Sequence, residues 1–249
     1  MSSFETGMIA LVCVFGGSLL GMFLRTVLPK HHLDAETKDV VKLGMGLVGT
    51  MAALILGLLV TSAKGSFDTQ SAELTQVSAN ALMLDRILAH YGPEASEVRE
   101  GLKSVVARAL DRMGSQTRTA PGDQGPHGNE SLYEKIHQLA PKDETQRSLK
   151  SEALAIAVSL GQTRWLMYEQ QGVAPSKVLV FVMIFWLSIV FLSWGLFAPN
   201  HATVVVNFLA AALAVSVALF LILEMYTPYS GLIRISSSPL RSALAQLGN

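Results

Sequence analysis

Six histidines and a single cysteine are the side chains in this chain that are suited to metal binding or nucleophilic chemistry. A site of either kind needs several such groups at a spacing that lets them converge. His31 and His32 are adjacent in a polar loop, where neighbouring side chains point apart. The other four histidines have no second ligand at helical spacing, and Cys13 lies in an apolar run, where a thiol usually acts as a small hydrophobic group. The sequence therefore predicts no catalytic residue, no metal site and no cofactor.

The common catalytic and nucleotide-binding patterns are absent as well. The chain contains no GxSxG, HExxH, P-loop or GxGxxG sequence. We therefore expect a protein that is not an enzyme.

Two charged residues, Glu224 and Arg234, lie at or beyond the end of an apolar segment. Glu224 ends an otherwise apolar segment, and a carboxylate in that position is a candidate for lining an ion path. Arg234, in the run SGLIRIS, could hold a positive charge at a pore mouth and attract anions. For both residues the alternative is an anchoring position at the membrane interface, which their places beyond the apolar core favour.

The composition indicates that these residues are carried by a membrane protein. Half of the 249 residues are hydrophobic and only 15% are charged, against about 25% charged in soluble proteins; the mean hydropathy is +0.40. Lysine plus arginine equals aspartate plus glutamate at 19 each, so no basic excess favours nucleic acid as a partner. One cysteine excludes an intrachain disulfide.

Four apolar segments are long enough to cross a bilayer, which takes about 20 residues of helix. They cover residues 8–28, 43–63, 178–198 and 204–225. We expect two transmembrane hairpins, 1–63 and 178–226. The first apolar segment has no lysine or arginine before it and no small-residue cleavage site after it, which favours a retained helix over a signal peptide.

The polar region between the hairpins, residues 64–177, carries apolar stripes at spacings of three and four, which predict helices. One stripe runs from Leu74 to Tyr91 and stops at Gly92-Pro93. Residues 114–130 are rich in glycine, proline and polar residues and predict a mobile loop. Residues 227–249 predict an interfacial segment with a short amphipathic helix. The expected fold class is thus an all-α membrane protein with a helical soluble region between spans two and three.

The second span is the most informative helix. Small residues recur in it every four positions, at Gly49, Ala53, Gly57, Thr61 and Gly65. This pattern lets another helix approach closely, either within one subunit or between subunits. An adjacent row at the same spacing contains Thr50, Leu54 and Leu58. If the small stripe packs between subunits and the adjacent row faces a central axis, rings of leucine could gate a pore by dewetting.

Several segments resemble a known family. LGLLVTSAKGSFD, residues 56–68, resembles the stretch where the second transmembrane helix of bestrophins leaves the membrane. Three other runs resemble the bacterial bestrophin-like membrane proteins: LDRILAHYGPEA, LGQTRWLMYEQQ and TPYSGLIRISSSPLRSAL. Together with the four spans, the resemblance covers nearly the whole chain.

This resemblance implies an ion channel in a bacterial inner membrane, pentameric, with the soluble region and both termini in the cytoplasm. It places the pore neck at Thr50, Leu54 and Leu58, and we add Thr61 as a further pore-lining position. The aromatic residues of the bestrophin neck and the acidic calcium clasp of animal members are missing here, so calcium gating is not expected.

We therefore expect an oligomeric ion channel whose partners are membrane lipid, further copies of the chain and small inorganic ions. An apolar neck leaves the charge selectivity open. The alternative is a non-conducting scaffold or signalling protein that recruits a partner through its soluble helices, using the stripe from Leu74 to Tyr91. Equal numbers of basic residues on the two sides of the membrane leave the orientation open on charge alone.

Overall fold

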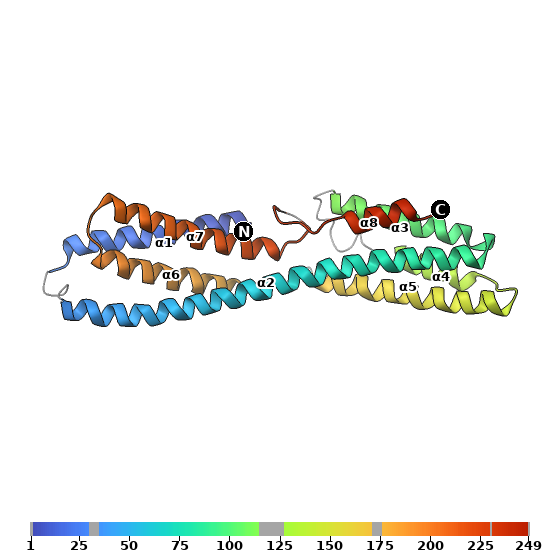
Figure 1. The fold of residues 1–249 in the computed structure, drawn as a ribbon, viewed down its shortest axis with the longest axis horizontal. Coiled ribbons are helices and arrows are strands. Elements are labelled where there is room, and N and C mark those ends of the chain that lie inside the picture. Colours follow the sequence, from blue (N-terminus) through green and yellow to red (C-terminus); the bar gives the residue numbers. More distant parts are fainter. Residues whose placement is uncertain (1, 30–34, 115–126, 171–175, 230, 249) are drawn as a thin grey trace. The chain divides into compact units, whose positions relative to one another are not determined.

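The computed structural model describes residues 2–29, 35–114, 127–170, 176–229 and 231–248. These residues form helices and no strands, as Figure 1 shows. The helices are α1 (Ser3–Val27), α2 (Ala35–Tyr91), the short 3₁₀ helix η2 (Pro93–Ala95), α3 (Ser96–Gly114), α4 (His127–Gln138), α5 (Glu144–Gln170), α6 (Lys177–Phe197), α7 (Ala202–Met225) and α8 (Ser238–Gln246). Four of them, α1, α2, α6 and α7, are long and apolar enough to cross a membrane. The expected all-α membrane fold with four spans is confirmed.

The chain divides into two compact units. The first consists of residues 1–66 and 174–226, and the second of residues 67–173 and 227–249. α2 contributes to both, because it continues for 57 residues without a break. It ends at Tyr91, before Gly92, whose φ of 123° is unfavourable for a residue with a side chain. Pro93 follows and supplies the first residue of η2.

The first unit is held together by very close contact between α1 and α6. A Cβ atom built on Gly21 of α1 would overlap the carbonyl oxygen of Leu192, and one on Gly17 would lie 2.8 Å from the carbonyl oxygen of Ser188. On the facing helix, a Cβ atom on Gly195 would overlap the carbonyl oxygen of Ser18. The two backbones therefore touch at glycines, the arrangement that small residues permit in membranes.

α1 also packs on α7, so its neighbours belong to the other predicted hairpin (Figure 1). Val14 of α1 is buried with Phe191 of α6 and with Phe208 and Ala212 of α7. At its carboxyl end, Arg25 donates a hydrogen bond to the carbonyl oxygen of Ala198, just after α6. The two predicted hairpins pair helices that are adjacent in the sequence. Such pairing does not identify the contacts of α1 with α6 and α7.

The second unit has a continuous apolar core from α2, α3, α4, α5 and α8. The predicted stripe lies at its centre, with Leu74, Ala81, Leu84, Leu88 and Tyr91 all buried. These residues pack with others of the same chain, among them Leu102, Ile136 and Leu160. The stripe is therefore not an exposed surface to which a partner helix could bind.

The predicted loop 114–130 differs from the structure at both of its ends. Gly114 ends α3 and His127 begins α4, so both ends are helical; residues 115–126 lie outside the described residues. The burial of Leu132 and Ile136 holds α4 and explains why it begins inside the polar segment. The apolar side of the C-terminal segment packs in the core of the second unit, through Leu240 and Leu247. The place of this segment at the membrane interface stays a prediction.

A buried ion pair fastens the C-terminal segment to this core. The carboxylate of Asp85 on α2 is only 3% exposed. It accepts hydrogen bonds from Nε and Nη2 of Arg99 on α3, at 2.8 and 2.9 Å. It also accepts one from the backbone N–H of Gly248 at 3.3 Å. Burial raises the pKa of Asp85, but the bonds from Arg99 and Gly248 outweigh burial and lower it below its usual value.

Candidate functional site

One face of α2 is buried in the first unit. Ala52, Leu59 and Ala63 are buried, with Met183 of α6 and Ile222 of α7 packed against them. Their spacing of seven and four residues places them on a single side of the helix. At the end of this contact the Tyr226 hydroxyl group donates a hydrogen bond to Oγ of Ser62, at 3.0 Å.

The predicted pore-lining residues occupy the opposite face. At about 100° per residue, Leu54 lies roughly 200° around the helix from Ala52. Leu54 and Leu58 are each 70% exposed, and Thr50 and Thr61 are exposed too. Val40, Leu43 and Leu47 extend this exposed apolar face toward the start of α2. The chain by itself therefore leaves an uncovered row along its second span.

The row presents methyl groups and two hydroxyl groups but no charge. Thr50 Oγ1 donates to the carbonyl oxygen of Leu47 at 2.8 Å, and Thr61 Oγ1 donates to that of Gly57 at 3.0 Å. Each hydroxyl hydrogen is thus used within the helix, and only oxygen lone pairs face outward. Such a surface cannot replace the water around an ion, so an ion passing it meets a dehydration barrier.

The small stripe of α2 is not a packing seam within the chain. A Cβ atom built on Gly49 or Gly57 would meet nothing within 4 Å, and Ala53 is exposed. The close packing within the chain occurs at Gly17, Gly21 and Gly195 instead. Gly17 and Gly21 have the same four-residue spacing, which is the signal in the sequence that could identify this contact.

Glu224 and Arg234 belong to different units of the structure. Glu224 is buried, near the end of α7 in the first unit. Arg234 belongs to the second unit, where its side chain is exposed and its Nε donates to the carbonyl oxygen of Gly231 at 2.7 Å. Their assignment to a pore mouth or to the interface stays a prediction.

The histidines give no site among the described residues. His31 and His32 lie outside the described part of the chain. Nδ1 of His90 lies 2.7 Å from the carbonyl oxygen of Arg86, one turn earlier in α2. No group of three histidine, cysteine, aspartate or glutamate side chains within the described ranges is arranged to hold a metal ion.

Comparison with known proteins identifies a family. The family model described as "Bestrophin-like domain" matches residues 12–240. No significant match is found among curated proteins or among solved structures. The matched range contains the uncovered row of α2 and most of the core of the second unit and of the C-terminal segment.

Proposed function

This chain belongs to the bestrophin-like family, and from this membership we propose that it is an oligomeric ion channel with its pore along α2. Several copies surround a central axis, and the row of Thr50, Leu54, Leu58 and Thr61 lines the narrow neck. The supporting observation is the contrast between the two faces of α2: one is buried in the first unit, and the opposite one is uncovered and free of charge.

The small stripe supports an assembly of this kind. On the helix, Gly57 lies about 60° to one side of Leu54. A neighbouring copy that packs against this flank leaves the leucine row directed toward the axis. The open space at Gly49 and Gly57 gives room for such an approach. When one surface of a subunit binds a different surface of its neighbour, the copies form a closed ring if the rotation between them closes.

The permeation path selects by size and by the ease of losing water, because the neck has no charged ring. The permeant species are small inorganic ions, with the sign of charge open. Following the family resemblance, the protein is placed in a bacterial inner membrane with its soluble region and termini in the cytoplasm. Its role is passive transport without catalysis.

The direct experiment is to reconstitute the purified chain in a planar bilayer under a KCl gradient. Discrete openings are expected, and the reversal potential then gives the charge selectivity. A silent bilayer, with the same preparation shown to be folded and oligomeric, would contradict the channel and favour the scaffold.

Widening the neck is the first test of the pore assignment. In the double variant Leu54→Ala/Leu58→Ala, we expect a several-fold higher conductance or a constant leak, because smaller side chains let water remain in the neck. The matched control is Leu209→Ala/Leu213→Ala, two leucines at the same spacing on the exposed side of α7. Equal conductance in wild type and the α2 variant would show that the row does not line the pore.

Filling the open space of the small stripe tests the assembly. Gly57→Val is expected to shift the protein from the oligomer to smaller species in native mass spectrometry, because the added side chain keeps the neighbouring copy away. Within one chain the site is open, so folding should be unaffected. Gly44→Val, at an equally open α2 glycine outside the stripe, is the control. An unchanged oligomer in Gly57→Val would place the subunit contact elsewhere.

The scaffold alternative rests on a different surface from the one the sequence suggested. The stripe from Leu74 to Tyr91 is internal. The exposed apolar side chains of the second unit include Val158, Trp165 and Leu166 on α5. A partner-recruiting protein would use these residues, and their replacement by polar residues would leave conductance unchanged.

A further inference from the structure

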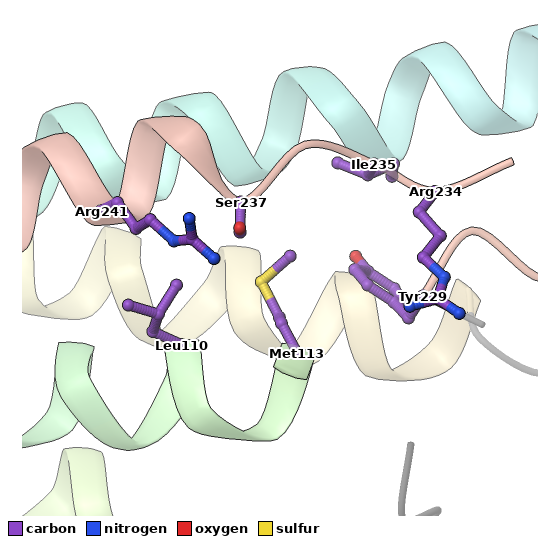
Figure 2. A pocket seen from close by; sticks show the side chains of 7 residues that line it. All are labelled: Leu110, Met113, Tyr229, Arg234, Ile235, Ser237 and Arg241. Atoms are coloured by element: carbon purple, nitrogen blue, oxygen red, sulfur yellow. The ribbon is translucent and has the colours of Figure 1, made fainter. Parts of the chain in front are cut away.

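The second unit contains a cavity that the pore proposal does not use. It has a volume of about 190 Å³ and lies between the end of α3 and the segment that leads into α8 (Figure 2). One part of its wall is apolar, formed by Leu110, Met113 and Ile235. The other part is polar and comes from Tyr229, Arg234, Ser237 and Arg241. A ligand that fits this wall combines a charged group with a small apolar portion.

The two arginines give the cavity a positive charge. Arg234 and Arg241 lie toward opposite ends of it in Figure 2. Neither forms an ion pair with a carboxylate among the described residues. Arg234 uses Nε for the Gly231 carbonyl group, and its terminal nitrogens remain available as donors. Burial, with a contribution from Glu73, raises the pKa of Tyr229. One carboxylate oxygen of Glu73 accepts a hydrogen bond from Gln170 at 2.8 Å, and the other, Oε2, is buried without a partner among the described residues.

The Tyr229 hydroxyl group is the clearest sign of a missing ligand atom. Its oxygen is fully buried and has no hydrogen-bond partner among the described residues. Burial, with a contribution from Glu73, raises the pKa of Tyr229 to about 12, so the hydroxyl group keeps its proton at physiological pH. A buried hydroxyl group without a partner destabilises the folded protein, and a hydrogen bond to an acceptor atom of a ligand would remove this cost.

The start of α8 adds a hydroxyl donor. Ser237 is its N-cap residue, but the Ser237 side chain makes no capping hydrogen bond. Figure 2 shows the hydroxyl group of Ser237 directed into the cavity beside the guanidinium group of Arg241. The backbone N–H of Ser238 already donates to Oγ of Ser236 at 3.2 Å, and Pro239 has no N–H. The amino end of the helix therefore contributes its partial positive charge, which favours an anion.

We propose that this cavity binds a phosphoryl group joined to a short carbon chain. Guanidinium and hydroxyl groups that reach the cavity from several directions match the several acceptor oxygens of a phosphate better than the flat carboxylate group. The volume corresponds to roughly six water molecules at about 30 Å³ each, enough for a phosphoryl group and a few carbon atoms. Leu110, Met113 and Ile235 contact the carbon chain. Two sources share this chemistry, a phospholipid headgroup and a soluble phosphate ester.

The test uses the full chain in nanodiscs of phosphatidylcholine, with thermal unfolding as the readout. One arm adds glycerol 3-phosphate to the solution, and the other includes phosphatidic acid in the nanodisc. A ligand that binds only the folded state raises the melting temperature in a concentration-dependent way. A rise in the first arm assigns the site to soluble phosphate esters, and a rise confined to the second arm assigns it to lipid.

Variants decide whether the effect comes from the cavity. Arg241→Gln and Arg234→Gln are each expected to weaken binding about tenfold or more, the usual cost of losing a charge-assisted hydrogen bond. Arg108→Gln, at an exposed arginine of α3 outside the cavity wall, is the matched control and should bind as wild type does.

Tyr229→Phe adds a second, independent readout. It removes the unpaired hydroxyl group, so the ligand-free protein should be as stable as wild type or more stable, while binding weakens. No stabilisation in either arm would overturn the proposal. So would stabilisation that all three cavity variants, Arg241→Gln, Arg234→Gln and Tyr229→Phe, retain in full.

Discussion

Replacement of Gly21 by alanine is expected to destabilise the transmembrane unit by about 3 kcal/mol, the upper part of the range for overpacked sites. The added methyl group would overlap the carbonyl oxygen of Leu192, which is backbone and has no other rotamer to adopt. α1 and α6 would have to separate along their whole contact. The measurement is unfolding in mixed micelles of increasing dodecyl sulfate content, followed by tryptophan fluorescence.

Variants of the neighbouring glycines provide the comparison for this experiment. Gly17→Ala should cost less than Gly21→Ala, because its Cβ atom would lie 2.8 Å from the Ser188 carbonyl oxygen. Gly16→Ala, on the same helix with nothing within 4 Å, should be neutral or slightly stabilising, since alanine favours helix. Equal stability of the Gly16 and Gly21 variants would refute the close contact between α1 and α6.

The second large effect is expected at Asp85. Asp85→Asn keeps the size of the side chain but leaves the charge of Arg99 without its partner in a mostly buried site. Breaking one side of a buried ion pair typically costs 3–5 kcal/mol, so we expect a loss of about 3 kcal/mol in the second unit. Thermal unfolding followed by circular dichroism measures it. The control is Glu97→Gln, which breaks the exposed pair with Lys135 and should change little.

The same residue makes stability depend on acidity in a defined direction. The pKa of Asp85 is lower in the folded chain than its usual value of 3.8. Its contribution is therefore complete above that value and is lost as the pH falls through the lower folded pKa. Below about pH 4 the wild type should lose stability faster than Asp85→Asn. Parallel curves for the two proteins would show that Asp85 does not contribute through its charge.

The sequence predicts the helices well and their partners poorly. Apolar runs and three-four stripes locate the four spans and the buried positions from Leu74 to Tyr91, because burial on one helical face requires that periodicity. The same periodicity cannot say which surface covers the stripe, so the sequence leaves open an external partner, as in the scaffold alternative. Gly21 and Gly57 have similar sequence surroundings, yet only one touches a neighbour within the chain.

For the candidate sites too, the sequence predicts positions on one helix better than contacts between segments. Helical spacing alone places Thr50, Leu54, Leu58 and Thr61 along one row, and the structure adds that this row lies opposite the buried face. The cavity at Tyr229 had no sequence signal. In the sequence Arg234 is a charge beside apolar residues. The residues that line the cavity with it come from α3 and from the start of α8, among others. Contacts between distant segments depend on tertiary packing, which local patterns do not encode.

The glycine contact between α1 and α6 has a consequence for biosynthesis. Gly21 and Gly195 are separated by about 170 residues of chain. At 5–20 residues per second, roughly 9–35 s pass between the synthesis of the first helix and that of its partner. During this interval the glycine face of α1 is in the bilayer without α6. The ribosome must finish most of the chain before the transmembrane unit can assemble, so a nascent chain that stalls before α6 leaves an incomplete bundle for membrane proteases to remove.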